Sequence, residues 1–252
     1  MPLFCFFISL ACYLLTLTPS VDLHDSGEMV SAVWLLGISH PPGYPLYCLF
    51  GKLWTGLIPF GNIAYRMNIL SAVSASLAVM MVYLITSKLI TDCQLPVTRA
   101  PEHQSTRAPA AKAIPAIIAS LVFAFSRLFW QQATFAEKYT LNAFFLSLLI
   151  FILLKWEEVR SQKSEVRSQK SKTYNLQLTT YNYLYLFAFL LGLSFCHHLQ
   201  TIFIVPSAIF LILGRLWNRR GTETQRRNKS EIRNPKSEIR NFLILFTFPL
   251  TL

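Results

Sequence analysis

The chain has 252 residues, of which 53% are hydrophobic and only 14% are charged. A soluble domain usually carries about 25% charged residues, and one soluble core cannot bury six long apolar runs without charge. These considerations exclude an ordinary soluble domain and favour an all-α, multi-pass membrane protein. The charge-free runs are residues 3–17, 69–87, 114–125, 141–154, 183–196 and 202–213.

The formal net charge of +11 would indicate nucleic acid in a soluble protein, but the basic residues are concentrated in three loops. Residues 88–112 contain four Lys or Arg, residues 155–172 contain six, and residues 215–240 contain nine. Such an excess marks the cytoplasmic loops of membrane proteins, so we expect topology, not nucleic-acid binding, to explain the charge. If all three basic loops lie on the cytoplasmic side, the chain must cross the membrane an even number of times between one basic loop and the next. We therefore expect about six membrane spans and a partial seventh at the end of residues 1–252.

The first expected span, residues 2–18, leads into an outer loop at residues 20–66. Proline disrupts helix interiors, so this loop is expected to form two short surface helices, near residues 27–37 and 46–57. Four prolines interrupt its apolar part: Pro41, Pro42, Pro45 and Pro59.

Three further pieces complete the expected topology. Residues 67–87 form the second span, and residues 114–130 and 139–155 form two spans joined by a short outer loop. A single helix over residues 181–214 would be about 51 Å long, well beyond the roughly 30 Å hydrocarbon core. We therefore predict two short spans with a break at residues 197–201, which places His197 and His198 on the outer side.

Two basic loops contain internal repeats. Residues 160–166 are nearly repeated at 167–172, and residues 229–234 at 236–241. Polar, charged repeats cannot build a core, so residues 156–180 and 218–240 are predicted to be disordered cytoplasmic insertions.

The first outer loop carries the most informative polar residues. Asp25 and Glu28 are three apart, a spacing compatible with a helix capping box as well as with a catalytic pair of carboxylates. His24 and Glu28 are four apart and could share a helix face, as metal ligands or as an ion pair. The proline-rich turn that follows presents His40 and Tyr44 at fixed angles.

The expected outer loops contain five further candidates for the functional site: Arg66, Glu137, Lys138, His197 and His198. Glu137 could simply cap the helix after it, and Lys138 could bind an anion or extend to the membrane interface. Ionisable residues near membrane spans are costly and usually functional, so these residues are candidates for substrate contacts.

Taken together, the sequence motifs of these outer loops resemble those of one protein family. It is a bacterial family of multi-pass proteins related to an animal endoplasmic-reticulum protein O-mannosyltransferase that modifies plexin-type receptors, and it looks like a branch of the GT-C glycosyltransferases. The motifs that carry the resemblance are residues 25–28, 36–47, 66–72, Trp130 with 133–142, and 192–198.

The resemblance implies transfer of a sugar, expected to be mannose, from a polyprenyl-phosphate donor to a protein or glycan acceptor. It places the enzyme in the bacterial cytoplasmic membrane with its active face outward, and it implies an acidic residue of the first outer loop as the base. Asp25 matches that residue best, with Glu28 as its catalytic partner. The expected contacts to substrate or phosphate are His40, Tyr44, Arg66, Glu137, Lys138, His197 and His198.

Two other interpretations stay open. One is a transporter or flippase of a lipid-linked substrate, and the other is an inactive, truncated remnant, because the family's proteins are normally longer. No metal site or cofactor is predicted, although a divalent metal is compatible with the acidic loop.

Overall fold

The computed structural model describes residues 1–22, 24–92, 108–165 and 170–213, and the described elements are all helical. The chain divides into two compact units, Met1–Ile202 and Phe203–Leu252, and all the candidate site residues lie in the first. The labelled helices are α1 (Pro2–Leu15), α2 (Ser26–Leu35), α3 (Pro45–Leu57), α4 (Ile63–Asp92), α5 (Ala108–Ala124), α6 (Arg127–Thr134), α7 (Lys138–Glu165), α8 (Lys170–Phe195) and the 3-10 helix η2 (Leu199–Phe203). Residues 204–213 are helical as well.

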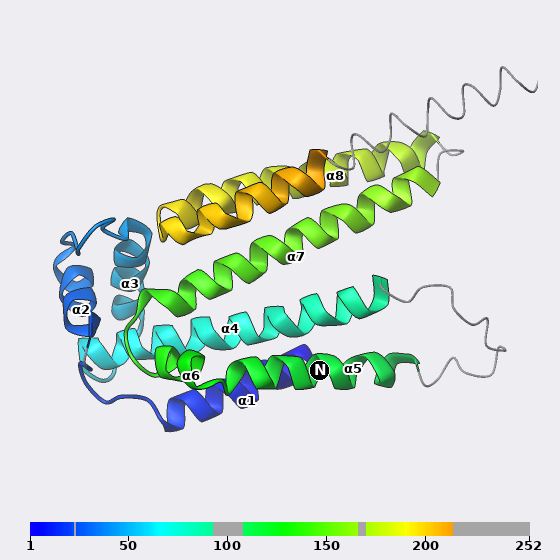
Figure 1. Ribbon diagram of the computed structural model, residues 1–252. Coiled ribbons are helices and arrows are strands. Elements are labelled where there is room, and N and C mark those ends of the chain that lie inside the picture. Colours follow the sequence, from blue (N-terminus) through cyan, green and yellow to red (C-terminus); the bar gives the residue numbers. More distant parts are fainter. Residues whose placement is uncertain (23, 93–107, 166–169, 214–252) are drawn as a thin grey trace, which may run out of the picture. The chain divides into compact units, whose positions relative to one another are not determined.

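Helix α4 is the centre of the first unit and packs against α1, α5 and α7, while α7 also packs against α8 (Figure 1). Small side chains make this packing close, because they let helix backbones approach one another. Ala72, Ala75 and Ala78 are buried along α4, together with Ser71 and Ser74.

Two described helices are long and apolar enough to cross a membrane, Ile63–Thr91 in α4 and Lys138–Ser161 in α7. The expected count of six spans is therefore not supported. Helix α1 is a shorter apolar helix of 14 residues. Helix α8 has 26 residues, but its first half is polar, and the predicted partial seventh span lies outside the described residues.

The predicted single span at residues 114–130 is wrong in one respect, because α5 and α6 form a bent pair. The segments Ala113–Ala124 and Arg127–Thr134 meet at 64°, and they make a third span only if the pair is counted as one. Ser126 causes the bend: its backbone is extended, and its hydroxyl donates to the Phe123 carbonyl, which ends the first helix.

The two short helices expected in the first loop are present as α2 and α3, both packed against α4 near its N-terminal end (Figure 1). A turn joins them, closed by a hydrogen bond from the Gly43 N–H to the His40 carbonyl at 2.9 Å. Gly43 has φ +91°, a conformation that glycine adopts readily. This turn sets His40 and Tyr44 side by side, with ring centroids 5.4 Å apart.

The chain breaks where the double histidine predicted it, since α8 ends at Phe195 and η2 begins at Leu199. Helix α7 continues to Glu165 and α8 begins at Lys170, so both helices extend into residues 156–180, and the disorder expected there stays a prediction. Charged side chains do not prevent a helix when flanking apolar turns already propagate it. Residues 218–240, also predicted to be disordered, lie outside the described residues.

Candidate active site

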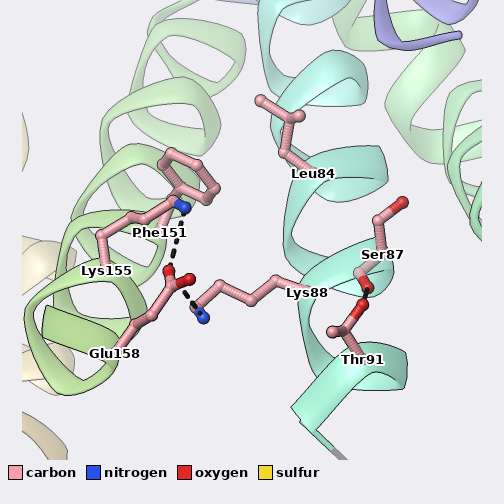
Figure 2. A pocket seen from close by; sticks show the side chains of 7 residues that line it. All are labelled: Leu84, Ser87, Lys88, Thr91, Phe151, Lys155 and Glu158. Atoms are coloured by element: carbon pink, nitrogen blue, oxygen red, sulfur yellow. Dashed lines mark hydrogen bonds and ion pairs between the residues drawn. The ribbon is translucent and has the colours of Figure 1, made fainter. Parts of the chain in front are cut away.

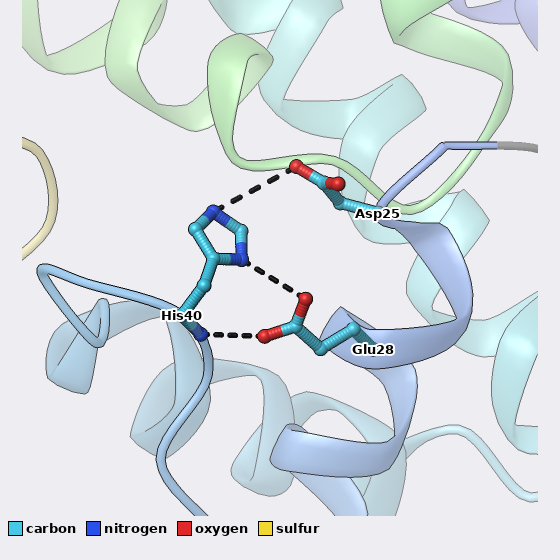
Figure 3. Close-up of side chains that lie close together, drawn as sticks. All are labelled: Asp25, Glu28 and His40. Carbon is cyan, nitrogen blue, oxygen red and sulfur yellow. Dashed lines mark hydrogen bonds and ion pairs between the residues drawn. The ribbon is translucent and has the colours of Figure 1, made fainter.

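Asp25 and Glu28 meet His40 at the start of α2 (Figure 3). Asp25 is the N-cap residue, yet its side chain makes no capping hydrogen bond. Glu28 also does not reach back to Asp25; its two carboxylate oxygens lie against the backbone N–H and the ring Nδ1 of His40, the latter at 3.0 Å. The capping box is therefore not formed, and both carboxylates are directed into a cluster of polar side chains.

Lys138 binds this cluster from the first residue of α7. Its ammonium nitrogen lies 2.6 Å from Asp25 Oδ2, 3.4 Å from His40 Nε2 and 3.5 Å from Glu137 Oε2. The Lys138 side chain is only 2% exposed, whereas that of Asp25 is 44% exposed. A buried ammonium thus holds one face of the Asp25 carboxylate, and the other face is open to solvent.

These contacts determine one consistent hydrogen-bonding pattern for His40. With the proton on Nδ1, the ring donates to Glu28 Oε2, and Nε2 is left to accept from the Lys138 ammonium. This tautomer is assigned from the network. It links Glu28, His40, Lys138 and Asp25 into one chain of donors and acceptors.

The two carboxylates of the loop are held ionised. The hydrogen bond from Lys138 lowers the pKa of Asp25 below its usual range. The backbone N–H of His40, helped by its ring, lowers the pKa of Glu28. Both groups therefore carry a negative charge at neutral pH.

Glu137 behaves differently because it is buried. Desolvation raises the pKa of its carboxyl in spite of the adjacent Lys138, since burial disfavours the charged form. Its backbone N–H donates to the Ser71 hydroxyl at 3.3 Å, and within the described residues its Oε2 has no hydrogen-bond partner. Asp25 is consequently the main counter-ion of Lys138.

Two tyrosines complete the surroundings of Lys138. Its ammonium lies 5.1 Å from the ring centroid of Tyr44 and 5.2 Å from that of Tyr139, within the range of a cation–π interaction. The hydroxyl of Tyr44 lies 3.4 Å from His40 Nε2. The His198 ring lies against both tyrosines, with centroid distances of 5.5 Å and 5.8 Å.

His197 supports the site from behind without facing it. Its Nε2 donates to the Lys138 carbonyl at 2.9 Å, and its ring stacks on Tyr47 with centroids 5.9 Å apart. Burial lowers the pKa of His197 to about 4, so the ring is neutral at pH 7. Burial also lowers the pKa of His198. His197 thus positions the first turn of α7, the turn that carries Lys138.

Arg66 lies outside this cluster, so the structure does not bring it together with the other residues predicted to contact substrate. Its guanidinium donates to the carbonyls of Thr55, Phe60 and Gly61 at 2.8–3.2 Å. These carbonyls belong to the end of α3 and the loop after it, where a helix leaves acceptors unsatisfied. Arg66 therefore stabilises the connection between α3 and α4. The other predicted positions, Asp25, Glu28, His40, Tyr44, Glu137, Lys138, His197 and His198, do come together.

Three residues of the cluster are of types that can bind a divalent metal. One ligand atom from each of Asp25, Glu28 and His40 lies within 4.8 Å of the others, but a cation there would lie beside the Lys138 ammonium, which is 2.6 Å from Asp25 Oδ2. Both Glu28 oxygens also have donors on His40. The residues fit an ion-pair network better than a metal site. His24, the other metal candidate of the sequence, stacks instead on Phe135.

Sequence reasoning missed Tyr139 and Ser71, which contact Lys138 and Glu137. The sequence could have indicated Tyr139, because this residue directly follows Lys138 in the predicted outer loop. Ser71 had none, since a serine within an apolar helix is common and only the packing of α4 against α7 brings it to Glu137.

The described helices, with their membrane-length apolar segments and a charged cluster at one end, define a helical membrane protein with a polar site beside its spans. The family described as "Protein O-mannosyl-transferase TMEM260 N-terminal domain" matches residues 25–221. Because that match covers most of the chain, the chain belongs to this family.

Two relatives agree with the family. The mouse protein O-mannosyl-transferase TMEM260 is 31% identical over 207 residues, which is 81% of this chain and 24% of the mouse protein. The Dictyostelium discoideum protein of the same name is 27% identical over 214 residues, 82% of this chain and 23% of that protein. The chain thus spans about a quarter of the length of these relatives. No solved structure matches it.

Proposed function

We propose that this chain forms part of a membrane glycosyltransferase that moves mannose from a polyprenyl-phosphate donor to a protein hydroxyl on the non-cytoplasmic side. The observation that carries the proposal is the Asp25 carboxylate, kept ionised by the buried Lys138 and exposed on its other face. The relatives are named protein O-mannosyl-transferases, which supports the sugar and the acceptor class.

Asp25 would act as the general base. An acceptor hydroxyl is a poor nucleophile at neutral pH, and a positioned base is typically worth 10²–10⁴-fold in rate. The Asp25 carboxylate takes the hydroxyl proton while the acceptor oxygen forms a bond to the anomeric carbon. The bond from that carbon to the phosphate oxygen breaks, and the phosphate leaves with its electron pair.

Lys138 would act on this step through Asp25 and not as a ligand of the phosphate. Its side chain is almost completely buried, and Asp25 lies directly on its ammonium. A preorganised charge next to the base keeps the base in its ionised form without reorganisation during the reaction. We assign Lys138 as a residue that positions Asp25. We assign Glu28 and His40 as the pair that holds the first outer loop closed over Lys138.

An apolar cavity supports a lipid-linked donor. A cavity of about 370 Å³ lies among residues of α3, α4, α7 and α8, and its walls are almost entirely apolar. Leu141, in its wall, is one helical turn after Lys138, and Leu46 is two residues after Tyr44. A prenyl tail in this cavity would bring its phosphate head toward the Asp25 cluster.

The decisive experiment is transfer from radiolabelled polyprenyl-phosphate mannose by the whole protein that contains this chain, comparing wild type, Asp25→Asn and Asp22→Asn. Asp22 is the matched control, a carboxylate of the same loop that hydrogen-bonds Thr18. We expect Asp25→Asn to lose about 10²–10⁴-fold in kcat and Asp22→Asn to stay near wild type. Equal transfer by wild type and Asp25→Asn would remove Asp25 as the base.

A transporter or flippase is the second candidate. Transporters place their charged residues near the membrane midplane, whereas the charged residues of α4 and α7 lie toward their ends. This distribution favours the enzyme. Flux of a lipid-linked sugar in proteoliposomes, without transfer to an acceptor, would favour the transporter instead.

A further inference from the structure

Lys138 is a buried cation between two carboxyl groups. Its ammonium nitrogen lies 2.6 Å from Asp25 Oδ2 and 3.5 Å from Glu137 Oε2. The side chain of Asp25 is 44% exposed, whereas that of Glu137 is only 3% exposed. Within the described part of the chain, no third carboxyl group contacts this ammonium. The proposed transfer uses Asp25 and assigns no role to Glu137.

The ion pairs at the other ends of α4 and α7 have a different arrangement (Figure 2). There Lys88 and Lys155 contact one oxygen of Glu158, at 3.0 Å and 2.9 Å, and the Glu158 side chain is 35% exposed. Water can therefore stabilise the Glu158 charge when one of these contacts is lost. The Lys138 side chain is only 2% exposed, so its charge depends on the carboxyl groups beside it.

The proposed reaction neutralises the nearer of the two carboxyl groups on Lys138. When Asp25 takes the proton of the acceptor hydroxyl, its carboxylate becomes a neutral carboxylic acid. A buried charge that has lost its partner is strongly destabilising. Another group in contact with Lys138 must then supply negative charge if the ammonium is to stay charged, and Glu137 is the carboxyl group in that position.

The groups that face Glu137 determine when it ionises. They are Lys138, Asp25, Tyr44 and Tyr47, and Lys138 is the cation among them. Burial raises the pKa of Glu137, and the charge of Asp25 raises it further. Neutralisation of Asp25 removes the second of these effects and also leaves Lys138 without its nearer partner. Both changes favour loss of the Glu137 proton.

We propose that Glu137 is the second counter-ion of Lys138 and that it ionises when Asp25 is neutralised. The inference rests on the proposed function for the event that neutralises Asp25. The acceptor proton goes to Asp25, and the proton of the Glu137 carboxyl goes to solvent, so the net charge of the three groups is the same before and after. Glu137 is thus a positioning residue, which keeps Lys138 charged and in place while Asp25 carries the proton.

The test uses Asp25→Asn, which imitates the neutralised base and needs no substrate. Infrared difference spectra of the whole protein that contains this chain report the C=O band of protonated Glu137, assigned by its absence in Glu137→Gln. Titration of this band should show that the pKa of Glu137 is lower in Asp25→Asn than in wild type, by about one unit or a tenfold change in proton affinity. Lys138→Met should raise this pKa, and the control Glu158→Gln should leave it as in wild type. An unchanged Glu137 pKa in Asp25→Asn or in Lys138→Met would overturn the proposal.

Thermal unfolding provides a second measurement of the same coupling. Glu137→Gln should lower the Tm by about 5 °C more in the Asp25→Asn background than in wild type, because it then removes the last carboxylate on a buried ammonium. Glu158→Gln should have the same effect in both backgrounds. Equal effects of Glu137→Gln in both backgrounds would contradict a second counter-ion. Full transfer activity in Asp25→Asn would instead remove Asp25 as the base and leave this coupling intact.

Discussion

Lys138 and Asp25 lie 113 positions apart in the chain, and their side chains meet at 2.6 Å. The contact joins the first turn of α7 to the cap of α2, so the base of the proposed reaction is oriented by a helix that follows it by more than a hundred residues.

Removing Lys138 should shift the pH dependence of transfer. Asp25 must be ionised to accept a proton, and Lys138 lowers its pKa, so Lys138→Met should raise that pKa. The acid limb of kcat/KM should then move to higher pH by about one unit or more. Lys138→Arg keeps the charge and should retain most of the wild-type profile. An unshifted acid limb in Lys138→Met would show that Lys138 does not control Asp25.

Replacing Glu137 should change how stability depends on pH. Its folded-state pKa is raised above the usual value near 4.3, so the folded protein binds more protons than the unfolded chain above that value. Stability is therefore full below that value and falls as pH rises through the folded pKa. Glu137→Gln should lose this decline, measured as the difference in Tm between mildly acidic and alkaline buffers. Parallel curves for both proteins would contradict a raised pKa of this buried carboxyl.

The contribution of His197 to stability should depend on pH in the opposite direction. Its pKa falls from 6.5 to about 4 in the folded protein, so stability is full above pH 6.5 and is lost as pH falls toward 4. The loss should approach about 3 kcal/mol. His197→Gln can still donate to the Lys138 carbonyl but cannot titrate, so its unfolding free energy should change less across this range. An equal acid loss in both proteins would assign the effect to other groups.

Arg66 should matter for folding and not for the reaction. Its guanidinium donates to three backbone carbonyls, and a hydrogen bond from a charged group is worth about 1.5–3 kcal/mol. Arg66→Ala should therefore lower the unfolding free energy by about 2 kcal/mol and leave KM unchanged in the folded fraction. A large rise in KM at unchanged stability would return Arg66 to the substrate site.

A larger side chain in the apolar cavity should weaken binding of a lipid-linked donor with a long tail more than that of a donor with a short tail. Leu77 lines this cavity, and Leu77→Trp should raise KM about tenfold for a long-chain donor, a loss of about 1.4 kcal/mol, with little effect on a donor with a very short tail. Phe4→Trp is the control, because Phe4 is exposed on α1. An equal effect on both donors would place the tail elsewhere.

The amino-acid sequence by itself determined the helices and the residue types available to the site. Apolar runs and the positions of Lys and Arg predict membrane helices, and prolines predict the two short helices and the turn that carries His40. The polar residues at 197–201 predict the break after α8. These features are local, since a helix depends on neighbouring residues and on hydrogen bonds within one segment.

Only the tertiary structure decided which polar residues work together. Asp25 and Lys138 meet because α2 and α7 both lie against α4 or its end, and Arg66 is turned toward the carbonyls after α3 although it belongs to the same outer region. The bend at Ser126 divides one expected span of the described chain into two helices. Such outcomes depend on packing between distant segments and on the need to satisfy buried polar groups, and no local pattern of residues contains that information.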